Sequence, residues 1–125
     1  MDAQDYILIV EDDFDIREAL TQILEEEGYA VRGAANGKEA LEVIASGPTP
    51  SLILLDLMMP VMNGWQFRAE QLQNPRPASV PVLVISADPH VQPKAATLGV
   101  AGLLKKPVSL DDLLSAVKTH RKSGG

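Results

Sequence analysis

Short apolar runs recur along the chain and alternate with segments of helical periodicity. Residues 6–10 form an unbroken apolar run rich in β-branched side chains, which is typical of a strand buried on both faces. Similar runs cover 51–55, 80–85 and, with fewer large side chains, 101–104. Residues 30–34 contain an arginine and are typical of an edge strand. The pattern predicts five strands.

Between the first two runs, apolar side chains recur at helical spacing. Those from Ile16 to Leu24 follow i, i+3, i+4, i+7, i+8, which predicts an amphipathic helix ending at Gly28. Asn36 is followed by glycine, a pair common in hairpin turns, but helical spacing continues after it. We therefore interpret Asn36 as the N-cap of a second helix, with Glu39 closing a capping box.

Three further helical segments are indicated with unequal clarity. Trp65, Phe67 and Leu72 support a helix between the third and fourth strands, and Ser109 with Asp112 predicts a capped final helix. After the fourth strand, an Asp-Pro pair at 88–89 is typical of a helix start, but Pro93 would remove an interior hydrogen bond. That helix either begins near Pro93 or is kinked. Strands alternating with helices predict an α/β fold with a parallel sheet covered on both faces.

Length and composition narrow the possible classes. The 125 residues fit one domain spanning 1–125, with 123–125 as a frayed tail or the start of a linker. A net charge of −6 argues against direct nucleic-acid binding, and the absence of cysteine excludes disulfides and Cys-ligated zinc. The acidic amino terminus does not resemble a secretory signal, and the apolar stretch 52–62 is too short and interrupted to insert in a membrane. We expect a soluble cytoplasmic protein.

Polar side chains follow the predicted strands at their carboxyl ends, where open parallel sheets bind ligands. They are Glu11, Asp12 and Asp13 after the first strand, Asp56 after the third, Ser86 after the fourth, and Lys105 and Lys106 after the fifth. Each has an ordinary alternative: the acidic residues as turns or helix caps, the serine as a strand end, and the lysine as a surface residue. Asp56 is harder to explain in that way, because it lies inside an apolar segment where an unpaired carboxylate is costly.

Considered together, these residues predict phosphoryl chemistry. Two carboxylates in contact repel by roughly 4 kcal/mol at an effective dielectric of about 20, so a positive charge must lie among them. Oxygen ligands without histidine or cysteine favour Mg²⁺, and Lys106 adds an ammonium. A cation, an ammonium and a hydroxyl around one carboxylate suit a transferred phosphoryl group, with Asp56 as the nucleophile that forms an aspartyl phosphate.

Over nearly its whole length the chain resembles the response regulator receiver family. The motifs that carry the resemblance are Val10-Glu11-Asp12-Asp13 leading into Ile16-Arg17, Asp56-Leu57-Met58-Met59-Pro60 with Gly64, Ser86-Ala87, and Lys106-Pro107. The resemblance implies a flavodoxin-like, doubly wound fold with strand order 2-1-3-4-5. It also implies a phosphorylation switch that is not an enzyme in the usual sense, in which Asp56 receives a phosphoryl group from a sensor histidine kinase or a phosphotransfer protein.

The same resemblance assigns roles within the site. Asp12, Asp56 and the main-chain carbonyl of Met58 would bind Mg²⁺, with Glu11 acting through water. Ser86 and Lys106 would contact the phosphoryl oxygens and couple the new charge to movement of the loops after the third and fourth strands, which presents a surface to a downstream protein target.

A departure from the family pattern and two alternative functions bear on this interpretation. The family often has an aromatic switch residue three positions before the lysine, where this chain has Leu103, which can equally be a core residue. Phosphohydrolases that use an aspartyl phosphate typically need a second aspartate two residues after the nucleophile, where this chain has Met58. The other alternative is a binding module that keeps the fold but works without phosphorylation, and the presence of all five polar site residues argues against it. The sequence leaves open whether the domain acts alone or belongs to a longer protein.

Overall fold

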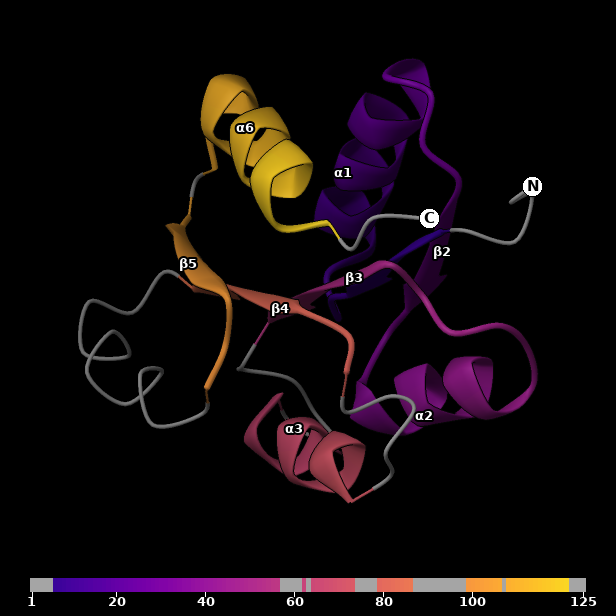
Figure 1. The fold of residues 1–125 in the computed structure, drawn as a ribbon. Helices are drawn as coiled ribbons and strands as arrows, with labels where there is room; N and C mark the ends of the chain where they lie inside the picture. Colours follow the sequence, from indigo (N-terminus) through magenta and orange to yellow (C-terminus); the bar gives the residue numbers. More distant parts are fainter. Residues whose placement is uncertain are drawn as a thin grey trace.

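The protein is a single parallel sheet with helices on both faces, as the sequence pattern predicts (Figure 1). The computed structural model describes residues 6–56, 62, 64–73, 79–86, 99–106 and 108–121. The strands are β1 (Ile7–Val10), β2 (Val31–Ala34), β3 (Leu52–Asp56), β4 (Val82–Ser86) and β5 (Gly102–Lys105). All four neighbouring pairs are parallel, and the order β2-β1-β3-β4-β5 confirms the expected topology with β2 at one edge.

The helices of the described residues form two layers. They are α1 (Phe14–Glu26), α2 (Gly37–Ala45), α3 (Gly64–Leu72) and α6 (Leu110–His120). Helices α1 and α6 cover one face of the sheet, and α2 and α3 cover the other (Figure 1). The predicted helix around Pro93, the predicted tail at 123–125 and the first five residues lie outside the described residues. In the part of the chain that is described, the helices are too short or too polar to cross a bilayer.

Alternate residues of each central strand enter two different cores, which explains the unbroken apolar runs. In β1, Leu8 and Val10 pack into the core under α2 and α3, whereas Ile7 and Ile9 pack into the core under α1 and α6. All four side chains are at most 1% exposed. Full burial of a side chain of this size stabilises the fold by roughly 1.5–3 kcal/mol relative to exposure, so both faces of the central strands must be apolar.

Local capping fixes the helix ends close to where the sequence places them. Helix α2 begins after Asn36, whose Oδ1 accepts a 2.9 Å hydrogen bond from the Glu39 amide, while Glu39 Oε1 accepts one of the same length from Ala35. The reciprocal bond therefore reaches one residue further back than in a standard capping box. Gly28 ends the α1 segment with φ of 95°, a conformation that favours glycine.

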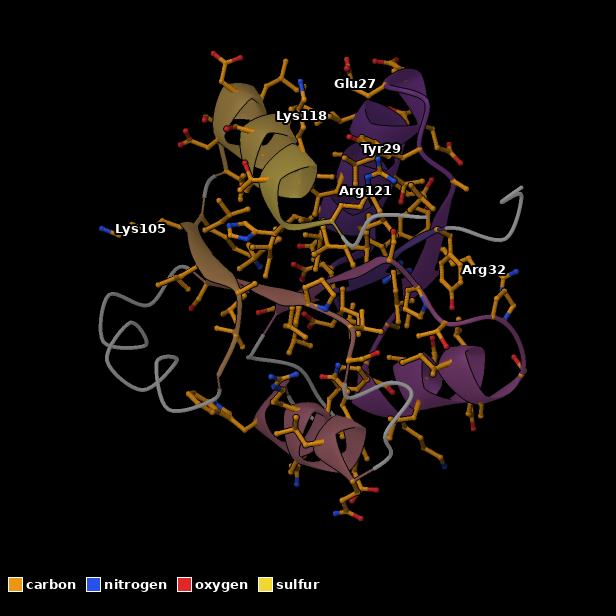
Figure 2. The ribbon with its side chains drawn as sticks, in the orientation of Figure 1. Glu27, Tyr29, Arg32, Lys105, Lys118 and Arg121 are labelled. Carbon is orange, nitrogen blue, oxygen red and sulfur yellow. The ribbon has the colours of Figure 1, made fainter. Side chains whose placement is uncertain are left out.

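The final helix is capped at both ends. The Ser109 hydroxyl accepts a 3.1 Å hydrogen bond from the Asp112 amide, as the sequence predicts. At the other end, the last turn of α6 carries Lys118, a favourable charge for a helix carboxyl terminus. Arg121 follows and stacks on Tyr29, with the guanidinium carbon 5.2 Å from the ring centroid (Figure 2). This contact joins the end of α6 to the connection between α1 and β2.

Helix α3 has a buried face that is partly polar, which explains its weak sequence signal. The predicted helix is present, and Phe67 is fully buried, but Leu72 is 51% exposed and does not contribute to the buried face. Arg68 and Gln71 take its place. Arg68 donates to the Gln71 side-chain oxygen at 2.8 Å and to the Gly99 carbonyl at 3.0 Å, and the Gln71 amide donates to the Val80 carbonyl at 3.2 Å. These bonds connect α3 to the segments that precede β4 and β5.

Candidate functional site

Three carboxylates meet at the carboxyl end of the two central strands. Glu11 and Asp12 directly follow β1, and Asp56 is the last residue of β3, which pairs with β1. One carboxylate oxygen of each residue lies within 4.8 Å of the other two. Glu11 is 2% exposed and Asp56 is 5% exposed, whereas Asp12 faces solvent. Parallel strands bring their carboxyl ends to one edge of a sheet, so the cluster follows directly from the topology.

Glu11 is anchored through both its main chain and its side chain. Its amide continues the β1–β2 ladder by donating to the Ala34 carbonyl at 3.0 Å, and its carbonyl accepts a 2.7 Å hydrogen bond from Arg17 Nη1. Its carboxylate Oε2 accepts the Asp13 amide at 3.1 Å. The carboxylate is therefore held in a defined position, although it is buried beside two other acidic groups.

Lys106 lies between the two buried carboxylates. Its Nζ is 2.8 Å from Glu11 Oε1 and 3.5 Å from Asp56 Oδ2, and its side chain is 22% exposed. Burial by itself lowers the pKa of this ammonium, but the hydrogen bond to Glu11 and the negative charges of Asp56 and Glu11 outweigh that effect, so the pKa of Lys106 is raised. The ammonium stays charged at neutral pH and offsets part of the repulsion in the cluster.

The neighbouring lysine has a different environment. Lys105 ends β5, is exposed, and points away from the sheet (Figure 2). The Lys106 amide donates to the Ser86 carbonyl at 3.0 Å, which extends the β4–β5 pairing by one residue. Successive side chains of an extended segment point to opposite faces, so Lys106 projects the other way from Lys105. Of the two lysines at this position in the sequence, the structure therefore brings Lys106 into the cluster.

Ser86 occupies the adjacent strand end. It is the last residue of β4 and 5% exposed, and it lies one residue beyond Ile85, the β4 residue that pairs with Asp56. Ser86 therefore lies at the end of the strand next to β3, which ends at Asp56. Asp13 has a structural role: its Oδ1 caps α1 by accepting the Ile16 amide at 3.1 Å. Met58 lies outside the described residues.

The donor chemistry of the cluster fits a hard divalent cation. The cluster contains three carboxylates and the Lys106 ammonium, so two negative charges remain when all four groups are ionised. Each pair in contact costs roughly 4 kcal/mol at an effective dielectric of about 20. Carboxylate oxygens without nitrogen or sulfur donors are the protein ligands that Mg²⁺ accepts, usually together with several waters.

Two contacts were not apparent from the sequence. Lys106 pairs with Glu11 as well as with Asp56, and Arg17 binds the Glu11 main chain. The Arg17 contact could have been predicted from the sequence. Side chains of a helix tilt toward its N-terminus, so a long side chain in the first turns of a helix can reach the end of the strand that precedes it. The leucine at the position of the usual aromatic switch, Leu103, is half-buried and packs against the core under α2 and α3, as a core residue would.

Comparison with known proteins identifies the family. The sequence model of the family described as the response regulator receiver domain matches residues 7–118 of this chain. The response regulator MprA of Mycolicibacterium vanbaalenii is 38% identical over 114 residues, which are 90% of this chain and 48% of that protein. MprA of Mycobacterium ulcerans is 39% identical over 114 residues, with the same 90% and 48% coverage. The chain spans about half the length of these curated relatives.

Solved structures show the same fold. Chemotaxis protein CheY4 of Vibrio cholerae is 28% identical with a TM-score of 0.86, over 94% of this chain and 99% of that one. The receiver domain of a signal transduction histidine kinase from Syntrophus aciditrophicus is 33% identical with a TM-score of 0.83, over 94% and 89%. Response regulator TrrA of Thermotoga maritima, in complex with Mg²⁺-BeF, is 30% identical with a TM-score of 0.82, over 92% and 97%. The chain belongs to the response regulator receiver family, whose members are signalling domains of two-component systems and not conventional enzymes.

Proposed function

We propose that Asp56 accepts a phosphoryl group from the phosphohistidine of a sensor histidine kinase or a phosphotransfer protein in a reaction that requires Mg²⁺. The observation that carries this proposal is the clustering of three carboxylates within 4.8 Å, with Lys106 bridging Glu11 and Asp56 at 2.8 and 3.5 Å. We further propose that residues 1–125 form one receiver domain, since the family match covers 7–118.

Glu11, Asp12 and Asp56 would hold the ion, with Glu11 acting through water. The main-chain carbonyl of Met58 is a further proposed ligand that rests on family resemblance alone. Bound Mg²⁺ would supply positive charge to the oxygens of the transferred phosphoryl group. TrrA, a relative of the same fold, was solved in complex with Mg²⁺-BeF, which supports the proposal that this chain also binds Mg²⁺.

In the transfer step, an oxygen of the Asp56 carboxylate bonds to phosphorus while the bond between phosphorus and the donor imidazole nitrogen breaks. The electron pair of that bond stays on the imidazole, which takes a proton from solvent. Lys106 would provide a positive charge to the phosphoryl oxygens, and Ser86 a hydroxyl donor. Hydrolysis reverses the modification, since water attack on phosphorus releases inorganic phosphate and restores the Asp56 carboxylate.

Phosphorylation adds about 1.5 to 2 negative charges at Asp56. Ser86 and Lys106 lie at the ends of β4 and β5, so their movement toward the phosphoryl group would alter the segments that follow Asp56 and Ser86 and present a surface to a downstream protein target. Leu103 has no aromatic ring to rotate inward, so the switch in this chain would operate without that side-chain movement.

The test is the intact mass of the chain after incubation with acetyl phosphate, with Mg²⁺ and with EDTA. We expect one phosphate adduct on the wild-type chain, only with Mg²⁺, and none on Asp56→Asn. The matched control is Asp111→Asn, which removes an exposed carboxylate in the first turn of α6 and should be modified like the wild type. An unmodified wild-type chain would favour a binding module that works without phosphorylation, and an adduct on Asp56→Asn would place the acceptor elsewhere.

A further inference from the structure

The Arg17 side chain lies across the edge strand β2 and ends on the carbonyl that follows β1. Its Nη1 donates to the Glu11 carbonyl oxygen at 2.7 Å, a short distance typical of a charge-assisted hydrogen bond. Glu11 and Asp12 share the peptide group that contains this oxygen, and both belong to the carboxylate cluster. A donor fixed on that oxygen sets the orientation of the peptide plane from which both carboxylates project.

Gly33 provides the space that this path requires. Gly33 pairs with Ile9 in the sheet, and a Cβ built at Gly33 would lie 3.0 Å from Arg17 Cδ and 3.4 Å from Arg17 Cγ. Both atoms belong to the middle of the side chain, whose far end is fixed on Glu11, so a Cβ at position 33 would require a shift of a few tenths of an ångström in a side chain that is held at both ends. Glycine is otherwise unfavourable inside a strand, and the Arg17 stem gives a reason for its presence at this position.

The Arg17 main chain is also restrained. Its amide donates to the Asp13 carbonyl at 2.9 Å, and its carbonyl accepts the Thr21 hydroxyl at 2.8 Å, so the residue belongs to a regular first turn of α1. Its guanidinium carbon lies 5.5 Å from the centroid of the Phe14 ring, which lines the same end of the helix. The guanidinium is therefore held between Phe14, Gly33 and the Glu11 carbonyl.

We propose that Arg17 is a positioning residue for the carboxylate cluster, and that Gly33 assists it because a Cβ at position 33 would crowd the Arg17 stem. Among the residues that the structure describes, no carboxylate forms an ion pair with Arg17. Arg17 acts by fixing the orientation of the Glu11–Asp12 peptide group, so that the two carboxylates are positioned to bind a cation. The role in Mg²⁺ binding rests on the proposed function, whereas the ordering of the Glu11–Asp13 backbone does not.

The test compares Arg17→Ala, Arg17→Lys, Gly33→Ala and the double variant Arg17→Ala/Gly33→Ala. Arg32→Ala is the matched control, since it removes an arginine from β2 that stacks on Tyr6 at the other end of β1, with the guanidinium carbon 4.6 Å from the ring centroid (Figure 2). Calorimetric titration with Mg²⁺ alone gives the affinity. Amide hydrogen exchange of Asp13 in the metal-free protein reports the backbone, because that amide donates to Glu11 Oε2.

We expect Arg17→Ala to weaken Mg²⁺ binding about tenfold, the lower end of the range for residues that orient metal ligands, and Gly33→Ala to weaken it less. Arg17→Lys should recover most of the affinity, since one donor on the Glu11 carbonyl suffices. The double variant should bind no more weakly than Arg17→Ala, because the two substitutions break the same contact. Asp13 amide protection should fall in Arg17→Ala and stay unchanged in Arg32→Ala.

Unchanged Asp13 protection in Arg17→Ala would overturn the positioning role whatever the affinity of the wild type for Mg²⁺. An affinity of Arg17→Ala equal to that of the wild type, or an additive loss in the double variant, would also overturn it. A wild-type chain that binds no Mg²⁺ while Arg17→Ala still loses Asp13 protection would contradict the proposed function and leave the backbone role supported.

Discussion

Two clusters of buried polar side chains differ in how their charges are matched. At the carboxyl end of the sheet, Glu11 and Asp56 are almost fully buried beside Asp12, and the ammonium of Lys106 pairs with two of these three carboxylates, Glu11 and Asp56. In α3, Arg68 and Gln71 are buried as well, but their donors reach a side-chain amide oxygen and main-chain carbonyls of distant segments.

This difference indicates that the carboxylate cluster is a binding site, whereas the polar residues of α3 connect parts of the fold. Hydrogen bonds that satisfy buried donors stabilise a fold, and removing one partner leaves a costly unpaired group. A surplus of like charge instead destabilises the metal-free fold and favours binding of a cation. Substitutions in the two clusters should therefore have opposite effects on stability and on phosphorylation.

The largest expected effect on stability is that of Arg68→Met. We expect the free energy of unfolding to fall by about 2–3 kcal/mol, because the Gly99 carbonyl and the Gln71 amide oxygen lose a charged donor. Urea unfolding followed by circular dichroism measures this change, with Arg32→Met as a surface control. Under conditions where the variant is folded, Asp56 should still accept phosphate. A folded Arg68→Met variant that is not phosphorylated would indicate that α3 belongs to the site.

A smaller effect of opposite sign is expected for Asp56→Asn in EDTA. Removing one of three neighbouring carboxylates relieves repulsion, while Lys106 keeps its shorter contact with Glu11, so the free energy of unfolding should rise by about 1 kcal/mol. In saturating Mg²⁺ the difference should shrink or reverse, since the wild type gains stability from binding. Urea unfolding in both buffers gives the comparison. Destabilisation by Asp56→Asn in EDTA would indicate that Lys106 already compensates the cluster.

The smallest expected effect concerns alkaline pH. The pKa of Lys106 is raised in the folded state, so the folded chain binds this proton more tightly than the unfolded chain. The stabilisation is fully present below the ordinary lysine pKa of about 10.4 and is lost as pH rises through the higher pKa of the folded state. Stability measured by urea unfolding should therefore fall more steeply above pH ~10 for the wild type than for Lys106→Met. Parallel curves for the two proteins would show that the contacts with Glu11 and Asp56 are weak in solution.

Features set by neighbouring residues could be predicted from the sequence. The strands β1, β3 and β4 were recognisable because both of their faces are buried, and the α2 cap because Asn36 and Glu39 act on amides a few residues away. The gathering of Glu11, Asp12 and Asp56 followed from the convergence of parallel strand ends, which depends only on topology.

Features that depend on distant segments could not be predicted. The buried face of α3 includes Arg68 and Gln71, whose acceptors on Gly99 and Val80 are known only once the strands are in place. In the same way, the sequence does not show which carboxylate lies nearest to Lys106. That depends on the turn after β5, where the Lys106 amide donates to the Ser86 carbonyl.

The most direct test of the central claim is a calorimetric Mg²⁺ titration of the wild type, Asp12→Asn and Asp13→Asn. The two aspartates are adjacent, but Asp12 lies in the carboxylate cluster, whereas Asp13 caps α1, a role that asparagine can also fill. We predict binding of one ion by the wild type, similar affinity in Asp13→Asn, and an affinity at least about tenfold weaker in Asp12→Asn. Equal affinities in the two variants, or a wild-type chain that binds no Mg²⁺, would contradict the account.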